Sequence, residues 1–352
     1  MSSNKRRKKR MSKGKKWGII FGIEILAIII LVPVIYIMVQ LGRIKTATKD
    51  QVNLDNISVN DLDSDVLAEI KEGYRNIVLY GVDARDGSLD KGNRSDSIII
   101  VSINNKTKDV KLCSVYRDTL FSIPDHGFDK VTHAYAYGGA ELSMSVLNTN
   151  LDLSITEFVT VNFDVLAKVI DALGGLELTL ESDAEVEQIN MCIAEQNEVT
   201  GSDADALPGP GTYMMDGTQA TGYARIRKTE GGDFRRAERQ REVLDKMLAK
   251  AKSANILTLT KIINEVMPDI YTNLSTSDIL SIAKDVLSYN IVDQTGYPFN
   301  VTTGYYNNLD CVSSTDTLEE EVIQLHQYLF GSEAYSPSSK LIELSNSRPW
   351  LN

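Results

Sequence analysis

The sequence predicts an α/β fold in which helices cover both faces of a sheet, preceded by one transmembrane helix. Three observations support this prediction. Short runs of apolar and β-branched residues recur between residues 74 and 180, as buried strands require. Amphipathic helical patterns alternate with these runs, and such alternation is typical of a sheet covered on both faces. An apolar segment of membrane-spanning length lies near the N-terminus.

The N-terminal segment indicates a membrane anchor. Residues 1–16 contain nine lysines and arginines and no acidic residue, in a chain with a formal net charge of −11. Residues 17–42 follow, and they are apolar from Gly18 to Val39 apart from Glu24. This apolar run is long enough to cross a bilayer as a helix and too long for a signal-peptide core. A basic flank on one side places the N-terminus in the cytoplasm and the remaining chain outside. Because the anchor explains the basic tail, we predict no nucleic-acid partner.

Composition divides the rest of the chain into three parts. Residues 43–73 are polar and acidic, and we interpret them as an extracytoplasmic stalk that ends in a short helix. Residues 74–333 are long enough for one large α/β domain with its own core. Residues 334–352 would then form a C-terminal tail. The three cysteines are widely spaced and odd in number, which indicates neither a disulfide framework nor a zinc site.

The first strands of the domain are expected to gather charged residues at one end of the sheet. Strands are predicted at residues 76–80, 97–103 and 110–116, the last two joined by a hairpin. A turn centred in that hairpin places Arg117 opposite Asp96.

With the first strand antiparallel to the second, the charged residues near the ends of these strands would share one rim; they are Asp83, Arg94, Asp96 and Arg117. Solvated loop charges are the alternative interpretation.

Helices and strands alternate in the middle of the domain. We expect a helix at 140–148, a strand at 158–163, a helix at 164–173 that ends at two glycines, and a strand at 176–180. The inner side of the second helix is apolar, and periodicity does not distinguish ordinary core from a lipid-binding slot; its residues are Val165, Leu166, Val169, Ile170 and Leu173. Residues 181–206 are acidic and predict a surface excursion.

A second charged cluster follows a predicted helix at residues 216–221. Residues 223–227 alternate as a strand would, which places Tyr223, Arg225 and Arg227 on one face. Two arginines on one face repel each other unless an anion lies between them.

A helix is expected at 234–251 with Asp233 as its N-cap. Helical periodicity puts Asp233, Arg236 and Gln240 on its inward stripe, at the helix end that favours an anion. A capped helix with i, i+3 ion pairs is the alternative.

These residue types suit phosphate chemistry. Guanidinium groups match phosphate oxygens, and paired aspartates suit Mg²⁺, which takes few carboxylates and bridges phosphates. The candidates are Arg94, Arg117, Arg225, Arg227 and Arg236 as phosphate-binding residues, with Asp83, Asp96 and Asp233 as acceptors. The sequence contains no P-loop, Ser-His-Asp order or glycine-rich dinucleotide motif. The predicted chemistry is phosphoryl transfer on a pyrophosphate.

The chain resembles the LytR-CpsA-Psr cell-wall ligases over residues 74–331. The similar segments are residues 81–85, 94–97, 117–118, 134–139, 223–227, 232–236 and 239–240. The resemblance implies an α-β-α sandwich with a central mixed sheet, whose apolar interior holds a polyprenyl chain. It also implies a single-pass type II membrane protein of a Gram-positive bacterium with an extracytoplasmic domain.

The activity implied by the resemblance is a Mg²⁺-dependent phosphotransferase with a possible pyrophosphatase side activity. It would move a glycopolymer, such as a teichoic acid or a capsule-like polysaccharide, from a polyprenyl-pyrophosphate carrier to a peptidoglycan acceptor. The alternative is a membrane-anchored regulatory protein that holds the lipid-linked anion without turning it over, the transcriptional attenuator of older descriptions.

The resemblance also implies roles for single residues. Asp83 and Asp96 would hold Mg²⁺. The pyrophosphate would be bound by Arg94, Arg117, Lys130, Arg225, Arg227 and Gln240, and the residues Arg117, Asp233 and Arg236 would be catalytic. Two positions depart from the family pattern: Tyr116 stands where Pro is usual, and Arg235 where Gly is usual.

Overall fold

The computed structural model describes residues 45–48, 51–82, 84, 88–255, 258, 261, 262, 266 and 269–351. The predicted basic tail, the predicted transmembrane helix at 17–42, and Asp83 lie outside the described residues. The chain divides into two units, Met1–Arg43 and Ile44–Asn352, and every described residue belongs to the second. No helix within the described part of the chain is long and apolar enough to span a membrane.

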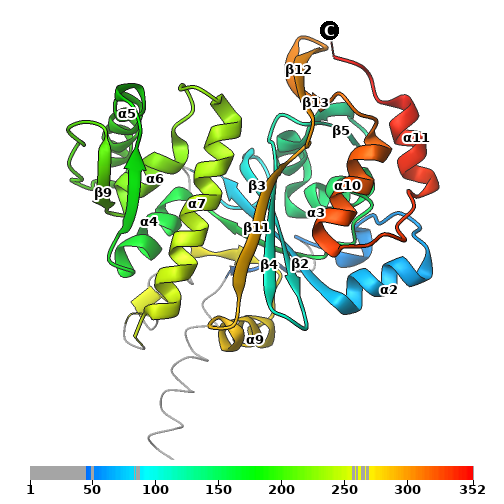
Figure 1. The fold of residues 1–352 in the computed structure, drawn as a ribbon, viewed down its shortest axis with the longest axis horizontal. Helices are drawn as coiled ribbons and strands as arrows, with labels where there is room; N and C mark the ends of the chain where they lie inside the picture. Colours follow the sequence, from blue (N-terminus) through cyan, green and yellow to red (C-terminus); the bar gives the residue numbers. More distant parts are fainter. Residues whose placement is uncertain are drawn as a thin grey trace, which may run out of the picture. The chain divides into compact units, whose positions relative to one another are not determined.

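A seven-stranded sheet forms the centre of the second unit (Figure 1). In spatial order its strands are β1 (Lys45–Thr46), β10 (Tyr271–Thr272), β7 (Glu157–Val161), β2 (Tyr74–Val82), β3 (Ser95–Asn104), β4 (Asp109–Val115) and β11 (Asn290–Tyr297). β2, β3 and β4 are antiparallel neighbours, whereas β7 runs parallel to β2 and β11 parallel to β4. The sheet is therefore mixed, as expected.

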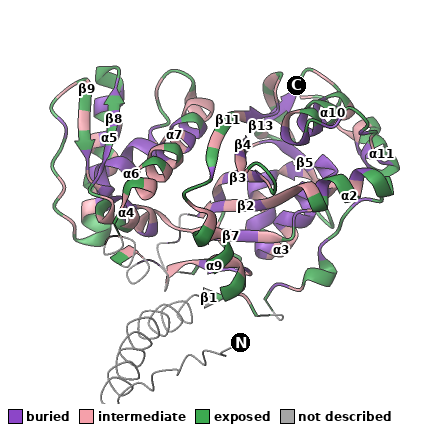
Figure 2. Cartoon of the chain, turned by 60° about the horizontal axis from the view of Figure 1, so that its bottom comes forward, coloured by how far each residue is buried: buried purple, intermediate pink, exposed green. Residues whose placement is uncertain are grey.

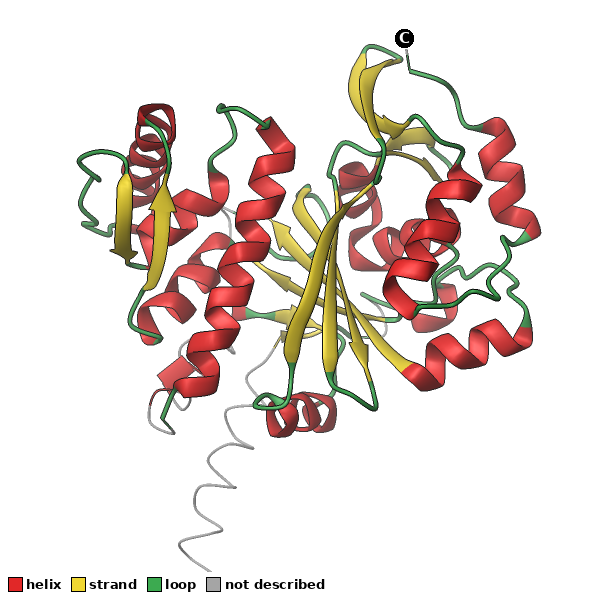
Figure 3. Ribbon diagram, viewed as in Figure 1, coloured by secondary structure: helices red, strands yellow, loops and turns green. Residues whose placement is uncertain are grey.

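Helices cover both faces of this sheet (Figure 3). Successive side chains of a strand point to opposite faces, so Val78 and Tyr80 of β2 pack in a different cluster from Ile77. The first face lies under α2 (Ser64–Gly73), α3 (Val131–Leu151) and α10 (Leu318–Phe330), and the second under α7 (Gly232–Ser253) and α9 (Thr276–Asp285). Most of α3 is buried (Figure 2).

The helix expected at residues 140–148 is the second half of α3. Its first half begins at Val131, and the two halves meet at Gly138 and Gly139, whose backbone is not helical. Gly139 has φ 65°, and a Cβ there would come within 3.1 Å of the Asp90 carboxylate. The range of α3 thus comprises two helices that meet in a kink at this glycine pair.

A smaller group of elements has its own apolar cluster beside the sheet. It consists of α4 (Phe163–Ala172), β8 (Leu176–Leu180), α5 (Asp183–Thr200), β9 (Gly211–Met215) and α6 (Gly217–Arg225). β8 pairs with β9 and not with the central sheet. The expectation of a surface excursion at 181–206 is wrong in part, because α5 buries Ile189 and Ile193 in this cluster.

The segments expected as stalk and tail both pack onto the domain. Val52, Ile57 and Ile70 join the main core, as does Leu341 of α11 (Ser339–Ser347). Two hairpins, β5–β6 (Leu120–Ile123, Gly127–Lys130) and β12–β13 (Val301–Tyr306, Leu309–Ser314), complete the unit with the short helix η1 (Leu54–Asn56). The segments expected as stalk and tail contain few apolar residues, so the sequence did not indicate that they pack against the core.

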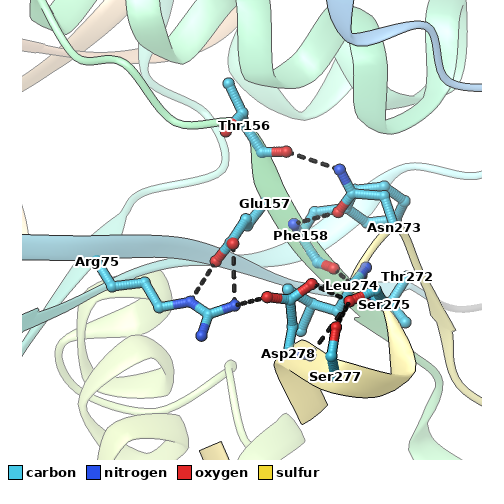
Figure 4. A network of polar contacts seen from close by, with 10 residues as sticks. All are labelled: Arg75, Thr156, Glu157, Phe158, Thr272, Asn273, Leu274, Ser275, Ser277 and Asp278. Atoms are coloured by element: carbon cyan, nitrogen blue, oxygen red, sulfur yellow. Dashed lines mark hydrogen bonds and ion pairs between the residues drawn. The ribbon is translucent and has the colours of Figure 1, made fainter. Parts of the chain in front are cut away.

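An ion-pair network fixes the start of α9 to the sheet (Figure 4). Arg75 of β2 donates to Glu157 of β7 at 2.7 and 2.9 Å, and its guanidinium lies 3.2 Å from the Asp278 carboxylate. Hydrogen bonds from Ser275 lower the pKa of Asp278, with a further contribution from Arg75. Asn273 joins the same network through the backbone of β7. The chain before α9 is thereby held against β7.

Candidate functional site

The register of β3 and β4 brings Asp96 and Arg117 together. Ile99 pairs with Ser114 and Ile103 with Val110, so the predicted register is confirmed. Beyond the last pair, the Arg117 guanidinium binds the Asp96 carboxylate directly. Arg94 lies immediately before β3. The rim expected from the sequence therefore contains these three residues.

Lys130 extends this rim from the end of β6. Its Nζ lies 3.0 Å from Oδ1 of Asp118, and Nε of Arg117 lies 3.6 Å from the same oxygen without hydrogen-bond geometry. Arg117 Nε is buried without a hydrogen-bond partner among the described residues, whereas the charge of Asp118 Oδ1 is balanced by these two ion pairs. Asp118 thus holds Lys130 and Arg117 next to each other at the rim.

The prediction of a strand at residues 223–227 is wrong, because the structure has the end of a helix there. α6 continues to Arg225, because its buried residues Ala220 and Ala224 pack into the cluster beside the sheet. The Tyr223 hydroxyl donates to Glu242 of α7 at 2.7 Å, so Tyr223 shares no face with the arginines. A run of five residues with alternating polarity fits the end of a helix as well as a strand. Packing against the neighbouring elements selected the helix.

The prediction that Asp233 is the N-cap of α7 is wrong. That position belongs to Gly231, and Asp233 lies in the first turn. Its carboxylate is 2.9 Å from the Arg227 guanidinium and 2.7 Å from that of Arg236. Arg236 also donates to the Asp96 carbonyl at 3.4 Å, and burial lowers the pKa of its guanidinium. One aspartate thus holds two arginines of the site.

These arginines surround a cavity of about 170 Å³, which we call the arginine cavity. Its wall is formed by Asp96, Arg117, Phe163, Ala224, Arg225, Arg227, Arg236 and Gln240. Arg225 is held by Glu195 at 2.7 Å, and its guanidinium lies 5.0 Å from the centre of the Phe163 ring. The four guanidinium groups are paired with three carboxylates, those of Asp96, Asp233 and Glu195, so one positive charge remains in excess and favours an anion.

A second cavity, the apolar cavity, adjoins the arginine cavity and is lined by residues of the sheet, α4 and α7. It encloses about 260 Å³ and shares Phe163, Ala224 and Gln240 with the arginine cavity. Its apolar wall includes Leu79, Ile99, Val159, Val165, Leu166, Val169, Val243, Leu244, Met247 and Ile270. The inward stripe of α7 is thus polar at its start and apolar later, as expected. Of the five residues expected on the inner side of α4, three line this cavity rather than closed core: Val165, Leu166 and Val169.

A third cavity, the histidine cavity, encloses about 660 Å³ on polar walls. It is lined by Gly92, Asn93, Arg94, Asp96, Arg117, His133, Ala136, Tyr137 and Arg227. Asp96, Arg117 and Arg227 line the arginine cavity as well. Sequence reasoning missed His133, Tyr137 and Glu195, although the spacing of four between Asp129 and His133 was a usable signal.

The described part of the chain contains no group of three or more His, Cys, Asp or Glu side chains that could hold a metal ion. Of the two metal ligands expected, only Asp96 is described. Its carboxylate lies in the walls of both polar cavities, next to the place where a phosphate would bind. That arrangement fits Mg²⁺, which is bound through one or two carboxylates and completed by phosphate oxygens.

Comparison with known proteins gives relatives along most of the chain. The LytR_cpsA_psr family matches residues 35–326. Polyisoprenyl-teichoic acid–peptidoglycan teichoic acid transferase TagT of Bacillus subtilis (strain 168) is 32% identical over 240 residues, which cover 66% of this chain and 71% of the relative. The transferase TagU of Enterococcus faecalis (strain ATCC 700802 / V583) is 33% identical over 291 residues, which cover 79% and 86%.

A solved structure shares the fold. The LytR-CPS2A-psr family protein YwtF (TagT) with bound octaprenyl pyrophosphate lipid superposes with a TM-score of 0.55 at 25% identity. The match covers 82% of this chain and 99% of that one.

Proposed function

The chain belongs to the LytR-CpsA-Psr family, and from that premise we propose that it transfers a glycopolymer from a polyprenyl-pyrophosphate carrier to peptidoglycan. One observation carries this proposal. The apolar cavity and the arginine cavity adjoin at three residues that line both, and this arrangement suits one amphiphile with an apolar chain and an anionic head. Octaprenyl pyrophosphate, bound in the related TagT, has this build. A teichoic acid or a capsule-like polysaccharide is the cargo that the relatives suggest.

The arginines would act on the pyrophosphate by position and charge. Phosphoryl transfer moves negative charge onto the leaving phosphate, and donors already in place stabilise that charge without reorganisation. Asp233 fixes Arg227 and Arg236, and Asp96 fixes Arg117, before any ligand arrives. Gln240 lines both cavities and so lies where the apolar chain would meet the pyrophosphate, whereas Arg225 lines the arginine cavity but not the apolar one. Arg94 and Lys130 would add charge from the rim.

Mg²⁺ would be held by Asp83 and Asp96 together with phosphate oxygens, where it would neutralise charge on the pyrophosphate. Asp96→Ala should remove the Mg²⁺ dependence of turnover and lower turnover strongly, while the thermal unfolding temperature changes little because Asp96 lies at a polar rim. A Mg²⁺ titration of the hydrolysis of octaprenyl pyrophosphate to octaprenyl monophosphate and orthophosphate measures this. Undiminished wild-type turnover in excess chelator would contradict a metal role.

Transfer itself is the decisive test. The full-length protein in detergent is given a polyprenyl-pyrophosphate-linked glycopolymer and peptidoglycan fragments, and the expected products are polymer-modified peptidoglycan and polyprenyl monophosphate. Tight donor binding without either product would favour the regulatory alternative. Neither binding nor transfer would overturn both proposals.

We also propose that residues 17–42 anchor the protein as a single-pass type II membrane protein, with the second unit outside the cell. The support is the sequence: a basic flank followed by an apolar run. Protease added to intact protoplasts should remove the second unit. Its full protection would exclude this topology.

A further inference from the structure

We propose that His133 is the general base that takes the proton from the acceptor hydroxyl, with Asp129 and Tyr137 as the residues that position it. The inference rests on the proposed function, because it names the group that activates the nucleophile of the same transfer. His133 lies in the first turn of α3, four residues after Asp129 at the end of β6. Nothing in the pyrophosphate chemistry described above uses these three residues.

The imidazole of His133 is held from one side. Its Nδ1 lies 2.9 Å from Oδ1 of Asp129, and the Tyr137 hydroxyl donates to Oδ2 of the same carboxylate at 2.8 Å. The backbone N–H of Lys130 donates to Oδ1 at 2.7 Å. Asp129 is buried, so its carboxylate is fixed by three donors from β6 and α3. Base, orienting carboxylate and supporting donor form the arrangement typical of an activating histidine.

The contact with Asp129 also determines which nitrogen acts. A carboxylate only accepts hydrogen bonds, so Nδ1 carries the hydrogen and Nε2 keeps the free lone pair. Within the described residues, Nε2 has no hydrogen-bond partner. Because His133 lines the histidine cavity, Nε2 is the nitrogen available to a hydroxyl bound there. Asp129 would then stabilise the imidazolium that forms.

The histidine cavity adjoins the proposed binding place of the pyrophosphate but not that of the prenyl chain. It shares Asp96, Arg117 and Arg227 with the arginine cavity and no residue with the apolar cavity. At about 660 Å³ it is also the largest of the three, and its walls are polar. An acceptor sugar can therefore enter on this side while the lipid occupies the other.

The proposed transfer forms one bond to phosphorus, breaks another and moves one proton. The acceptor oxygen forms a bond to the phosphorus that carries the glycopolymer, and the bond from that phosphorus to the bridging oxygen breaks. Polyprenyl monophosphate leaves with the electron pair. The hydroxyl proton moves to Nε2 of His133, which later releases it to solvent.

His133→Gln in the full-length protein is the direct test. General-base catalysis is typically worth about 10²–10⁴-fold, so kcat for transfer should fall at least about a hundredfold. The dissociation constant for octaprenyl pyrophosphate should stay within about twofold, since the lost group acts only on the acceptor. His126→Gln is the matched control, because exposed His126 stacks on Tyr137 at 4.0 Å but does not line the cavity.

The pH profile separates a base from a structural residue. Wild-type kcat should fall on the acid side as the imidazole takes up a proton, and His133→Gln should lack that limb. The charged and titratable groups facing His133 are Asp129, Tyr137, Arg94, Asp96, Arg117 and Arg227. Asp129→Asn should lower kcat and displace the acid limb, because it loosens the ring without removing it.

The outcomes distinguish a failure of the general-base assignment from a failure of the proposed function. If wild-type protein transfers and His133→Gln keeps its kcat and acid limb, the general-base assignment is overturned while the proposed function stands. If His133→Gln loses donor affinity in proportion to its rate, His133 belongs to pyrophosphate binding and the assignment is also overturned. Should wild-type protein neither bind nor transfer, the proposed function fails first. Should His133→Gln unfold, the profile of Asp129→Asn decides.

Discussion

At the scale of single residues, the site is arranged by acids that hold arginines. Asp233 binds Arg227 and Arg236, and Asp96 binds Arg117. Arg227 is half-exposed, so its ion pair with Asp233 contributes little to stability. The value of the three pairs is that the guanidinium groups are already oriented when an anion arrives. Substitution of Arg227 should therefore alter turnover much more than the free energy of unfolding.

Arg227→Lys tests the orientation of one guanidinium. Lysine keeps the charge but loses the planar pair of donors, and losing one well-placed donor typically lowers turnover about a hundredfold. Arg235→Lys is the matched control, since Arg235 pairs with Glu238 at 2.9 Å and lines neither polar cavity. Orthophosphate release from octaprenyl pyrophosphate, measured for both variants, decides. Equal and small effects would mean that Arg227 serves only in surface ion pairs.

At the scale of elements, α7 joins the two chemistries of the site. Its first turns present Arg236 and Gln240 to the arginine cavity, and its later turns present Val243 and Leu244 to the apolar one. α4 closes the apolar cavity opposite α7 with residues of its own. A helix with a polar start and an apolar continuation on one stripe thus fits a ligand with an anionic head and an apolar chain.

Leu244→Trp tests whether the apolar cavity holds the lipid. The indole should fill part of the cavity and lower affinity for octaprenyl pyrophosphate about tenfold or more, because the chain loses room that the protein cannot replace cheaply. Affinity for inorganic pyrophosphate should remain. Asp245→Trp adds the same group to the exposed side of α7 and should leave both affinities near wild type. Retained lipid affinity in Leu244→Trp would place the chain elsewhere.

At the scale of the whole described unit, distant segments meet around Asp152 at the end of α3. Its carboxylate accepts from Asn60, from the Tyr335 hydroxyl at 2.6 Å, and from Ser338 at 2.7 Å. His326 of α10 stacks on Tyr335 with ring centres 3.6 Å apart. These contacts bind the first and last described segments to the core. None of these residues lines one of the three cavities, so the contacts concern stability and not the site.

His326 makes the stability of the unit depend on pH. Burial lowers its pKa to about 4 from an ordinary 6.5, so the unfolded chain binds a proton first as pH falls. Stability should therefore decrease between pH 6.5 and 4, by up to about 3 kcal/mol from this group. Urea unfolding at pH 7 and pH 5 measures it. His326→Gln should be less stable at pH 7 but lose less on acidification, and an equal loss in both proteins would assign the pH dependence to other groups.

The sequence by itself determined the parts that depend on neighbouring residues. The two β-branched runs and the short polar turn between them were sufficient for the register that joins Asp96 to Arg117. Helical periodicity was sufficient for the inward stripe of α7 with Arg236 and Gln240. Both signals are local, because turn chemistry and side-chain period are properties of a few consecutive residues.

Only the tertiary structure decided what depends on packing. Residues 223–227 fit a strand or a helix end equally well, and the burial of Ala224 beside α4 and α5 selected the helix. The apolar side of α4 became a cavity wall because α7, far along the chain, faces it. His133 joined the site because α3 brings it to Arg94 and Arg227. A cavity is a space left between elements distant in sequence, so no local pattern contains it.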